Sequence, residues 1–293
     1  MLLEFDADQR LWQETVRDAV SKQCPASLIR DIAENGVDSA PLWNSYVEAG
    51  WTELTDQENA VELAIVLEEL GRATDPTPML ATLTQYAPLV GDRFDPLRAG
   101  AAVYSGVAAD QVATRRVDVF DPVLHVAEVS FGGVHIADSE RLSADTERAH
   151  HVALMGMAIT MVGACQRILD LVVEHAKSRQ QFGVAIGTFQ AVQHKATDMY
   201  VAIERARALS YFAALTIAAD DPRRRLAAAM AKASAGECQA LVFKHGIQLF
   251  GAMGFTWEND LQFALKRAKA GELMLGGAAE HRALIAEQYG KDL

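Results

Sequence analysis

The chain contains 293 residues, of which 50% are hydrophobic, and its 27 basic and 39 acidic side chains give a formal net charge of −12. This composition is typical of a globular protein and excludes a disordered or fibrous chain. The acidic balance, with a pI of about 5.1, argues against nucleic acid or an anionic membrane as the main partner.

Cysteine usage and the N-terminus indicate a cytoplasmic protein. Cys24, Cys165 and Cys238 lie far apart in the sequence, so neither a disulfide framework nor a zinc site is predicted. The N-terminus is acidic and too poor in apolar residues for a signal peptide. No segment approaches the ~18 uninterrupted apolar residues that a membrane span requires.

Residues 1–96 form the first of three predicted parts and read as an N-terminal helical domain. Apolar residues recur at helical spacing from Phe5 to Val20, with Asp8 as the expected N-cap. A short helix is predicted over residues 42–47 and ends at Gly50. A third is predicted over 61–70 with Gly71 as its C-terminal stop, and a fourth over 80–90.

Residues 97–145 read as a truncated β domain, because the period of the apolar residues changes there. Four short strands are predicted, over residues 101–107, 117–120, 123–131 and 133–136. They suffice for a small sheet only.

Residues 146–293 read as a C-terminal four-helix bundle. Long apolar stripes run over residues 152–176, 192–217 and 226–247, and two shorter helices follow over 259–272 and 277–289. Long helices joined by short connections are typical of an up-and-down bundle. This part carries a net charge of +3, so we expect it to be the host of any anionic ligand.

Several isolated residues in the bundle favour a structural role over chemistry. One Glu-x-x-His match, Glu147 to His150, lacks the second copy that a di-iron site needs, so it reads as a capping and surface feature. His194 reads as a core or groove histidine. The methionines Met155, Met157 and Met161 read as core, and the arginines at 223–225 as a solvated loop.

One segment indicates anion binding. Residues 178–199 read SRQQFGVAIGTFQAVQHKATDM, so that Arg179 ends one long helix and Gln190 opens the next. A planar, permanently charged guanidinium suits a diphosphate, and a helix N-terminus favours an anion.

This segment resembles the acyl-CoA dehydrogenase family. Further similarity lies in IQLFGAMGFTWEND at residues 247–260 and in LWNSYVEAGW and VLEELGRATDPTPML in the N-terminal part. The resemblance implies the acyl-CoA dehydrogenase-like fold and FAD as the cofactor. It also implies α,β-desaturation of an acyl-CoA, in which a carboxylate removes the α proton and the flavin accepts hydride.

The chain departs from the family at the residues that a family member supplies to the flavin bound by its own subunit. An ungapped alignment from Gly254 brings Leu275 onto the position of the family's catalytic Glu, and the alternative base position falls near Ala153. The family's strand-domain segment along the flavin ring also has no counterpart between residues 97 and 145. No catalytic residue is therefore predicted in this chain.

The residues that the family supplies across a dimer interface are retained. They are Arg179 for the diphosphate, Gln190 and Gln248 with Gly251 for the nucleotide end, and Phe182 packing beside them. The resemblance implies a subunit of a heteromeric, 2:2 enzyme that shares FAD with a full-length partner. That partner would carry the base and bind most of the acyl-CoA, with a steroid side-chain CoA as the expected substrate.

Two alternatives stay open. A self-sufficient homo-oligomer could use a relocated base, for which Glu272 and Glu280 are the nearest carboxylates to Leu275. A purely structural partner that binds no flavin is the other, although the retained Arg179 and Gln190 argue against it.

Overall fold

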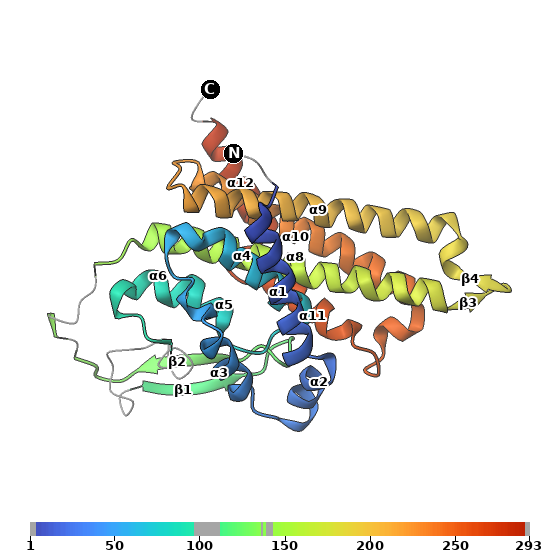
Figure 1. Ribbon diagram of the computed structural model, residues 1–293, viewed down its shortest axis with the longest axis horizontal. Helices are drawn as coiled ribbons and strands as arrows, with labels where there is room; N and C mark the ends of the chain where they lie inside the picture. The colour runs from blue at the N-terminus through green and yellow to red at the C-terminus, as the bar shows by residue number, and fades with distance from the viewer. Residues whose placement is uncertain (1–3, 97–111, 136, 139–142, 291–293) are drawn as a thin grey trace.

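The computed structural model describes residues 4–96, 112–135, 137–138 and 143–290. Figure 1 shows long helices running along the molecule, with shorter N-terminal helices against one side and a two-stranded hairpin near one end. The predicted mainly-α fold, with a small β middle part and a helical C-terminal part, is confirmed.

The N-terminal part is a set of short helices around one longer one. Its helices are α1 (Ala7–Gln23), α2 (Ala26–Asn35), α3 (Ala40–Glu48), α4 (Ala60–Ala73), α5 (Met79–Ala81), the π-helical turn η3 (Thr82–Tyr86) and α6 (Ala87–Val90). The short helix that was predicted to end at Gly50 ends at Glu48, and Gly50 adopts the left-handed conformation that follows it.

The N-cap of α1 is Asp6 and not Asp8 as predicted. The Asp6 side chain accepts a hydrogen bond from the Gln9 backbone at 2.8 Å, and the Gln9 side chain reaches back to the Asp6 backbone N–H. This reciprocal capping box leaves Asp8 in the first turn, where its charge complements the helix dipole.

The predicted stop at Gly71 is wrong, because α4 continues to Ala73 and its C-cap is Thr74 in the left-handed conformation. A Cβ at Gly71 would overlap the backbone carbonyl of Thr160 on the neighbouring helix α8 (Thr146–Ser178). The glycine is therefore required by a close helix crossing and does not terminate a helix.

The middle part contains an antiparallel hairpin of β1 (Val112–Val117) and β2 (Val126–Phe131), in which Val112 pairs with Phe131 and Val117 with Val126. Of the strand predicted over 117–120 only Val117 is in a strand, as the last residue of β1, because the chain leaves the ladder before the Asp121-Pro122 turn. Residues 133–135 of the strand predicted over 133–136 are not in a strand, and Gly133 has a φ of 64°, while residue 136 lies outside the described residues. The strand predicted over 101–107 lies outside the described residues.

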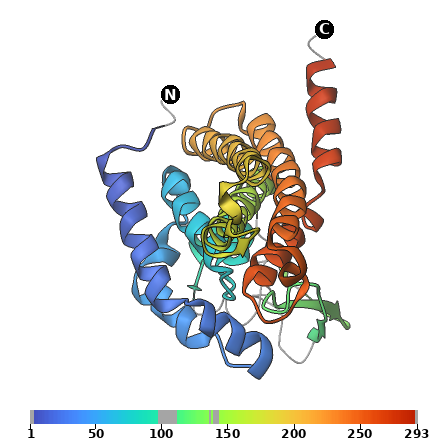
Figure 2. The same cartoon turned by 90° about the vertical axis from the view of Figure 1, so that its right-hand side faces the viewer.

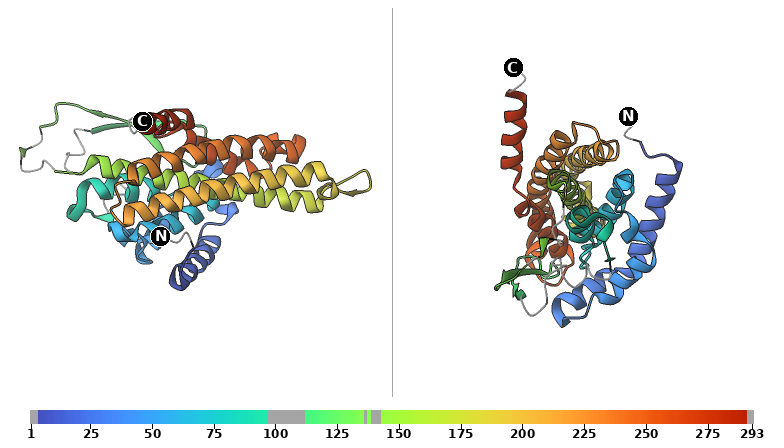
Figure 3. Two further views of the ribbon diagram at one scale, coloured as in Figure 1. Left: turned by 90° about the horizontal axis from the view of Figure 1, so that it is seen from above. Right: turned by 90° about the vertical axis from the view of Figure 1, so that its left-hand side faces the viewer.

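The C-terminal bundle matches the predicted stripes. Its elements are α8, the hairpin strands β3 (Gln180–Gln181) and β4 (Val184–Ala185), the turn η7 (Ile186–Thr188), α9 (Gln190–Ala218), α10 (Arg224–Phe250), the turn η8 (Gly251–Phe255), α11 (Leu261–Leu273) and α12 (Ala278–Gly290). Figure 2, which looks along the bundle, shows α12 on the outside of the bundle, and the views of Figure 3 agree. Arg282 of α12 pairs there with Glu237 of α10.

Helix α8 is the centre of the core. Met155, Met157 and Met161 are at most 2% exposed, as the sequence predicted. Within the described residues α8 is the one helix long and apolar enough to cross a membrane, but 89% of its most apolar window is buried inside the protein. Its apolar character is therefore explained by packing between α4, α9, α10 and α11.

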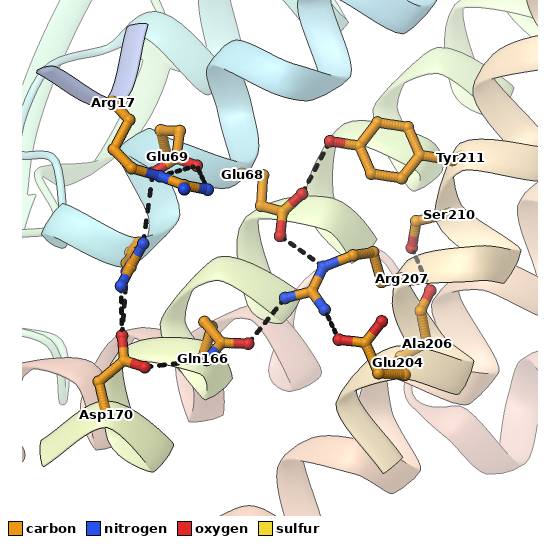
Figure 4. A network of polar contacts seen from close by, with 11 residues as sticks. Arg17, Glu68, Glu69, Gln166, Asp170, Glu204, Ala206, Arg207, Ser210 and Tyr211 are labelled. Atoms are coloured by element: carbon orange, nitrogen blue, oxygen red, sulfur yellow. Dashed lines mark hydrogen bonds and ion pairs between the residues drawn. The ribbon is translucent and has the colours of Figure 1, made fainter. Parts of the chain in front are cut away.

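A buried polar network joins the N-terminal helices to the bundle (Figure 4). Glu68 of α4 accepts hydrogen bonds from Arg207 Nε and Tyr211 Oη of α9, both at 2.7 Å. Arg207 also pairs with Glu204 and donates to Gln166 of α8 at 2.8 Å. The carboxylate is thus paired and hydrogen-bonded, as a buried charge must be.

Candidate functional site

The end of the bundle at β3 and β4 gathers the first predicted site residues (Figure 1). Arg179 is the C-cap of α8, and Gln190 is the first residue of α9. Between them Phe182 and Gly183 have φ values of 56° and 81°, which suit a tight two-residue hairpin turn. This turn lifts Phe182 into solvent, where it is 91% exposed and meets Phe189 edge to face at 6.1 Å.

The remaining predicted residues lie at the same end because α8 and α10 end side by side. His175 of α8 stacks on Phe250, the last residue of α10, with ring centroids 4.5 Å apart. Gln248 and Gly251 flank Phe250, and both are exposed. The structure therefore brings the five predicted binding residues to one end of the bundle, all accessible on its surface.

Arg179 is available to a ligand. Its side chain is exposed and makes no hydrogen bond or ion pair with another residue that the structure describes. Burial and the nearby Arg179 charge both lower the pKa of His175. The Arg179 guanidinium adds a permanent positive charge at this end, and the N-terminus of α9 supplements it.

Large apolar side chains on α9, in η8 and just after η8 are exposed. Phe255 is 78% exposed, Trp257 48%, and Val201 on α9 59%.

Leu275 lies in the turn between α11 and α12, in a left-handed conformation with φ of 58°. The turn is held from below by the fully buried Lys232, whose Nζ donates to the Gly276 carbonyl at 2.6 Å. His281 Nε2 is 2.8 Å from the Leu275 carbonyl. The backbone at this position is thus tightly fixed, while the Leu275 side chain has no group that can accept a proton.

The two carboxylates considered as relocated bases are placed differently. Glu272 Oε1 accepts from the Ala278 backbone N–H at 3.0 Å and so caps the start of α12, while Oε2 is 4.0 Å from Lys232 Nζ. Glu280 lies exposed on α12. Neither residue lines the large cavity described below.

The residues for which the sequence favoured a structural role either contact other side chains or are exposed to solvent. Asp145 caps α8 by accepting from Arg148 N at 2.9 Å, and the described residues hold no cluster of three or more His, Cys, Asp or Glu that could bind a metal. His194 is exposed on α9, so its predicted core or groove position is wrong. Arg223 pairs with Asp221 at 2.6 Å and Arg224 with Asp220 at 3.1 Å.

A cavity that the sequence did not predict lies between the N-terminal helices, the β1–β2 hairpin, α8 and α11. It has a volume of about 960 Å³, and its polar lining includes Asp75 and Arg267. Arg267 donates from Nε to Asp121 and from Nη1 to the Asp75 carbonyl, both at 2.6 Å. Arg267 contacts residues that are about 150 and 190 positions away in the sequence. No local sequence pattern could therefore predict these contacts or the cavity beside them.

Comparison with known proteins defines the class. The family model described as acyl-CoA dehydrogenase, C-terminal domain, matches residues 146–290. The chain is 31% identical to "Acyl-CoA dehydrogenase IpdE2" of Mycolicibacterium smegmatis, over 96% of this chain and 99% of that protein. It is also 31% identical to IpdE2 of Mycobacterium tuberculosis, over 93% of this chain and 94% of that one. The chain belongs to the acyl-CoA dehydrogenase family.

Solved structures share the fold. A chain of the ChsE4-ChsE5 complex from Mycobacterium tuberculosis aligns with a TM-score of 0.83 at 17% identity, covering 99% of both chains. A chain of the Tcur3481-Tcur3483 steroid acyl-CoA dehydrogenase aligns with a TM-score of 0.80 at 19% identity, covering 97% of this chain and 98% of that one. The family assignment explains the bundle and supports oxidoreductase chemistry and FAD as the family's usual cofactor.

Proposed function

We propose that this chain is the non-catalytic subunit of a heteromeric acyl-CoA dehydrogenase and completes the FAD site of a full-length partner subunit. The partner would supply the base and most of the acyl-CoA site. The chain alone would be inactive, because Leu275 stands where the family's base is expected.

One observation carries the proposal: the exposed end of the bundle presents the predicted binding groups, whereas Leu275, at the position expected for the family's base, has no group that accepts a proton. Arg179, Gln190 and Gln248 are accessible there, on a surface bordered by exposed aromatic rings. Leu275, by contrast, lies in the turn between α11 and α12. A subunit that only completes its partner's site needs the residues supplied across the interface and does not need a base of its own. The chain has this combination.

The exposed end fits one side of a dinucleotide. The Arg179 guanidinium can donate two parallel hydrogen bonds to a diphosphate, and the free N–H groups at the start of α9 favour the same anion. Gln190 and Gln248 can donate to and accept from the nucleotide, and Phe182 offers a ring face beside it. Bound flavin supplies the hydride acceptor in this family, while the protein residues hold and orient it.

The printed titles of two fold neighbours favour a two-protein assembly. One is a ChsE4-ChsE5 complex and the other a Tcur3481-Tcur3483 steroid enzyme. We extend from these to a heteromeric assembly for this chain, with a bulky steroid-type acyl-CoA as its substrate and the cytoplasm as its compartment.

Arg179→Ala tests the proposal in the co-expressed complex. We expect the FAD bound per complex to fall by at least tenfold, since a charged, bidentate contact to the diphosphate is lost. Arg10→Ala, at an exposed arginine on α1, should leave the FAD content unchanged. Unchanged FAD in Arg179→Ala would contradict the shared site and favour a purely structural partner.

A further inference from the structure

A second cavity, called here the α1–α2 cavity, lies between α1, α2, the end of α4, the middle of α8 and the start of α11. Its volume is about 590 Å³, and it shares no lining residue with the cavity of about 960 Å³. Buried apolar side chains form part of its lining, since Val20, Ile29 and Phe263 are each at most 3% exposed. Pockets of this size with apolar walls and a few fixed polar groups are the usual form of small-molecule sites.

Most charged side chains that line the α1–α2 cavity already have a partner of opposite charge. The ion pairs are Arg17–Glu69 and Arg72–Asp170, at 2.7 and 2.6 Å, and Lys22–Asp18 and Arg30–Asp260, at 2.6 and 2.8 Å. The charges within each pair largely neutralise each other, so these groups offer little net charge to a ligand.

Arg167 is the exception among the cations of this lining. It is half-buried on α8 and makes no hydrogen bond or ion pair with another residue that the structure describes. Glu14 also lacks a partner among the described residues, but it is exposed on α1, where water stabilises its charge. The Arg167 guanidinium has lost part of its hydration, so an anion in the cavity would compensate it.

Thr74 supplies a second polar group without a partner. It follows α4, lines the cavity and is 4% exposed, yet its hydroxyl makes no hydrogen bond with another described residue. Because hydroxyls in such buried positions are normally hydrogen-bonded, we expect this one to find its partner in a bound molecule.

We propose that the α1–α2 cavity binds a small amphipathic molecule with one carboxylate, which pairs with Arg167 while the apolar part packs against Ile29 and Phe263. The planar guanidinium can donate two parallel hydrogen bonds to a carboxylate. One negative charge matches the one half-buried cation that has no partner. A phosphate dianion would place a second negative charge in a lining that also contains Glu69 and Asp260, whose charges are already paired.

This site is separate from the proposed FAD contact. None of the five residues predicted to bind FAD lines the α1–α2 cavity. Arg179 follows Arg167 by 12 residues, which is about 18 Å along α8 at 1.5 Å per helical residue. The proposal therefore does not depend on the proposed function and can be tested without flavin.

Calorimetric titration of the purified chain with naphthalene-2-carboxylate tests the site. We expect saturable binding, and weaker binding, by about tenfold or more, of naphthalene-2-carboxamide, which has a similar shape but no charge. In Arg167→Gln the carboxylate should lose about tenfold or more in affinity, while the carboxamide should not. Lys177→Gln removes a charge at an exposed position of the same helix and should bind the carboxylate as the parent chain does.

Ala26→Leu is a second test that leaves Arg167 in place. Ala26 is the first residue of α2 and lines the cavity, so the larger side chain should lower the carboxylate affinity by about tenfold or more. Ala7→Leu, the same change at the exposed first residue of α1, should leave the affinity unchanged. The site would be refuted by absence of carboxylate binding, by a carboxamide that binds as tightly, or by unchanged affinity in Arg167→Gln or Ala26→Leu.

Discussion

At the residue scale, Asp75 shows how burial changes the properties of a single group. Asp75 follows the C-cap of α4 and is 6% exposed. Its Oδ2 accepts a hydrogen bond from the Thr77 hydroxyl, and its Oδ1 has no hydrogen-bond partner among the described residues. Burial, only partly offset by Thr77 and Arg267, raises the pKa of Asp75 from 3.8 to about 6. A proton is therefore held by the folded protein at a pH where the unfolded chain has lost it.

This shift predicts a pH dependence of stability. Between pH 4 and 6 the folded state binds more protons than the unfolded state, so the free energy of unfolding should fall as the pH rises through that window. The contribution is at most about 3 kcal/mol, from two pKa units. In Asp75→Asn, urea unfolding at pH 4 and pH 7 should show this part of the dependence removed, and an unaltered pH profile would contradict the assignment.

Residue patterns indicated which residues lie together at the exposed end of the bundle, but not the environment of buried side chains. Arg179 and Gln190 belong to one short segment, so the sequence itself indicates that they act together. The neighbours of Arg267 come from the N-terminal part and the middle part, and no spacing rule links them. The N-cap of α1 is equally hard to predict from sequence. Asp6 and Asp8 are both suitable capping residues, and only the hydrogen bonds with Gln9 in the structure identify Asp6 as the cap.

At the scale of the element, the crossing of α4 and α8 depends on two glycines. A Cβ at Gly71 would overlap the Thr160 carbonyl, and one at Gly163 would overlap the Glu68 carbonyl. The helices therefore approach at backbone distance, which aligns the N-terminal part against the bundle and forms one wall of the cavity. A glycine after an apolar stripe predicts a helix terminus, but glycine is common both after helices and at close crossings, so the pattern alone does not separate the two.

Gly71→Ala tests the crossing. Alanine is the better helix former by about 1 kcal/mol, so an uncrowded site would gain stability. Here the overlap with Thr160 forces the helices apart, and we expect a net loss of about 1–3 kcal/mol in urea unfolding. Gly132→Ala is the control, since a Cβ there meets nothing within 4 Å and the residue has no positive φ. A Gly71→Ala chain as stable as the parent would refute the close approach.

At the scale of the molecule, the Glu68 network connects α4, α8 and α9 into one unit (Figure 4). Arg207→Met should destabilise the chain by about 3–5 kcal/mol, because the buried Glu68 carboxylate loses its charged partner. Arg205→Met is the matched control on α9: its pair with Glu237 is half exposed, so the change should stay within about 1 kcal/mol. Equal effects of the two changes, measured by urea unfolding, would contradict a special role of the network.

The overall architecture was more predictable than its contacts. The bundle helices carry long, regular apolar stripes, so the stripes over residues 152–176, 192–217 and 226–247 fall within α8, α9 and α10. The short strands of the middle part were misplaced because alternation over four residues is a weak signal next to turns such as Asp121-Pro122. The cavity arises only when three parts of the chain meet, which no single stretch of sequence encodes.

The most direct test of the central claim is flavin absorbance together with native mass, for the chain alone and co-expressed with a full-length acyl-CoA dehydrogenase subunit from a neighbouring gene. We predict a colourless, inactive chain alone. With its partner it should form a yellow 2:2 complex that holds fewer flavins than subunits. A yellow homo-oligomer of this chain that oxidises an acyl-CoA by itself would contradict the account and return attention to Glu272 and Glu280.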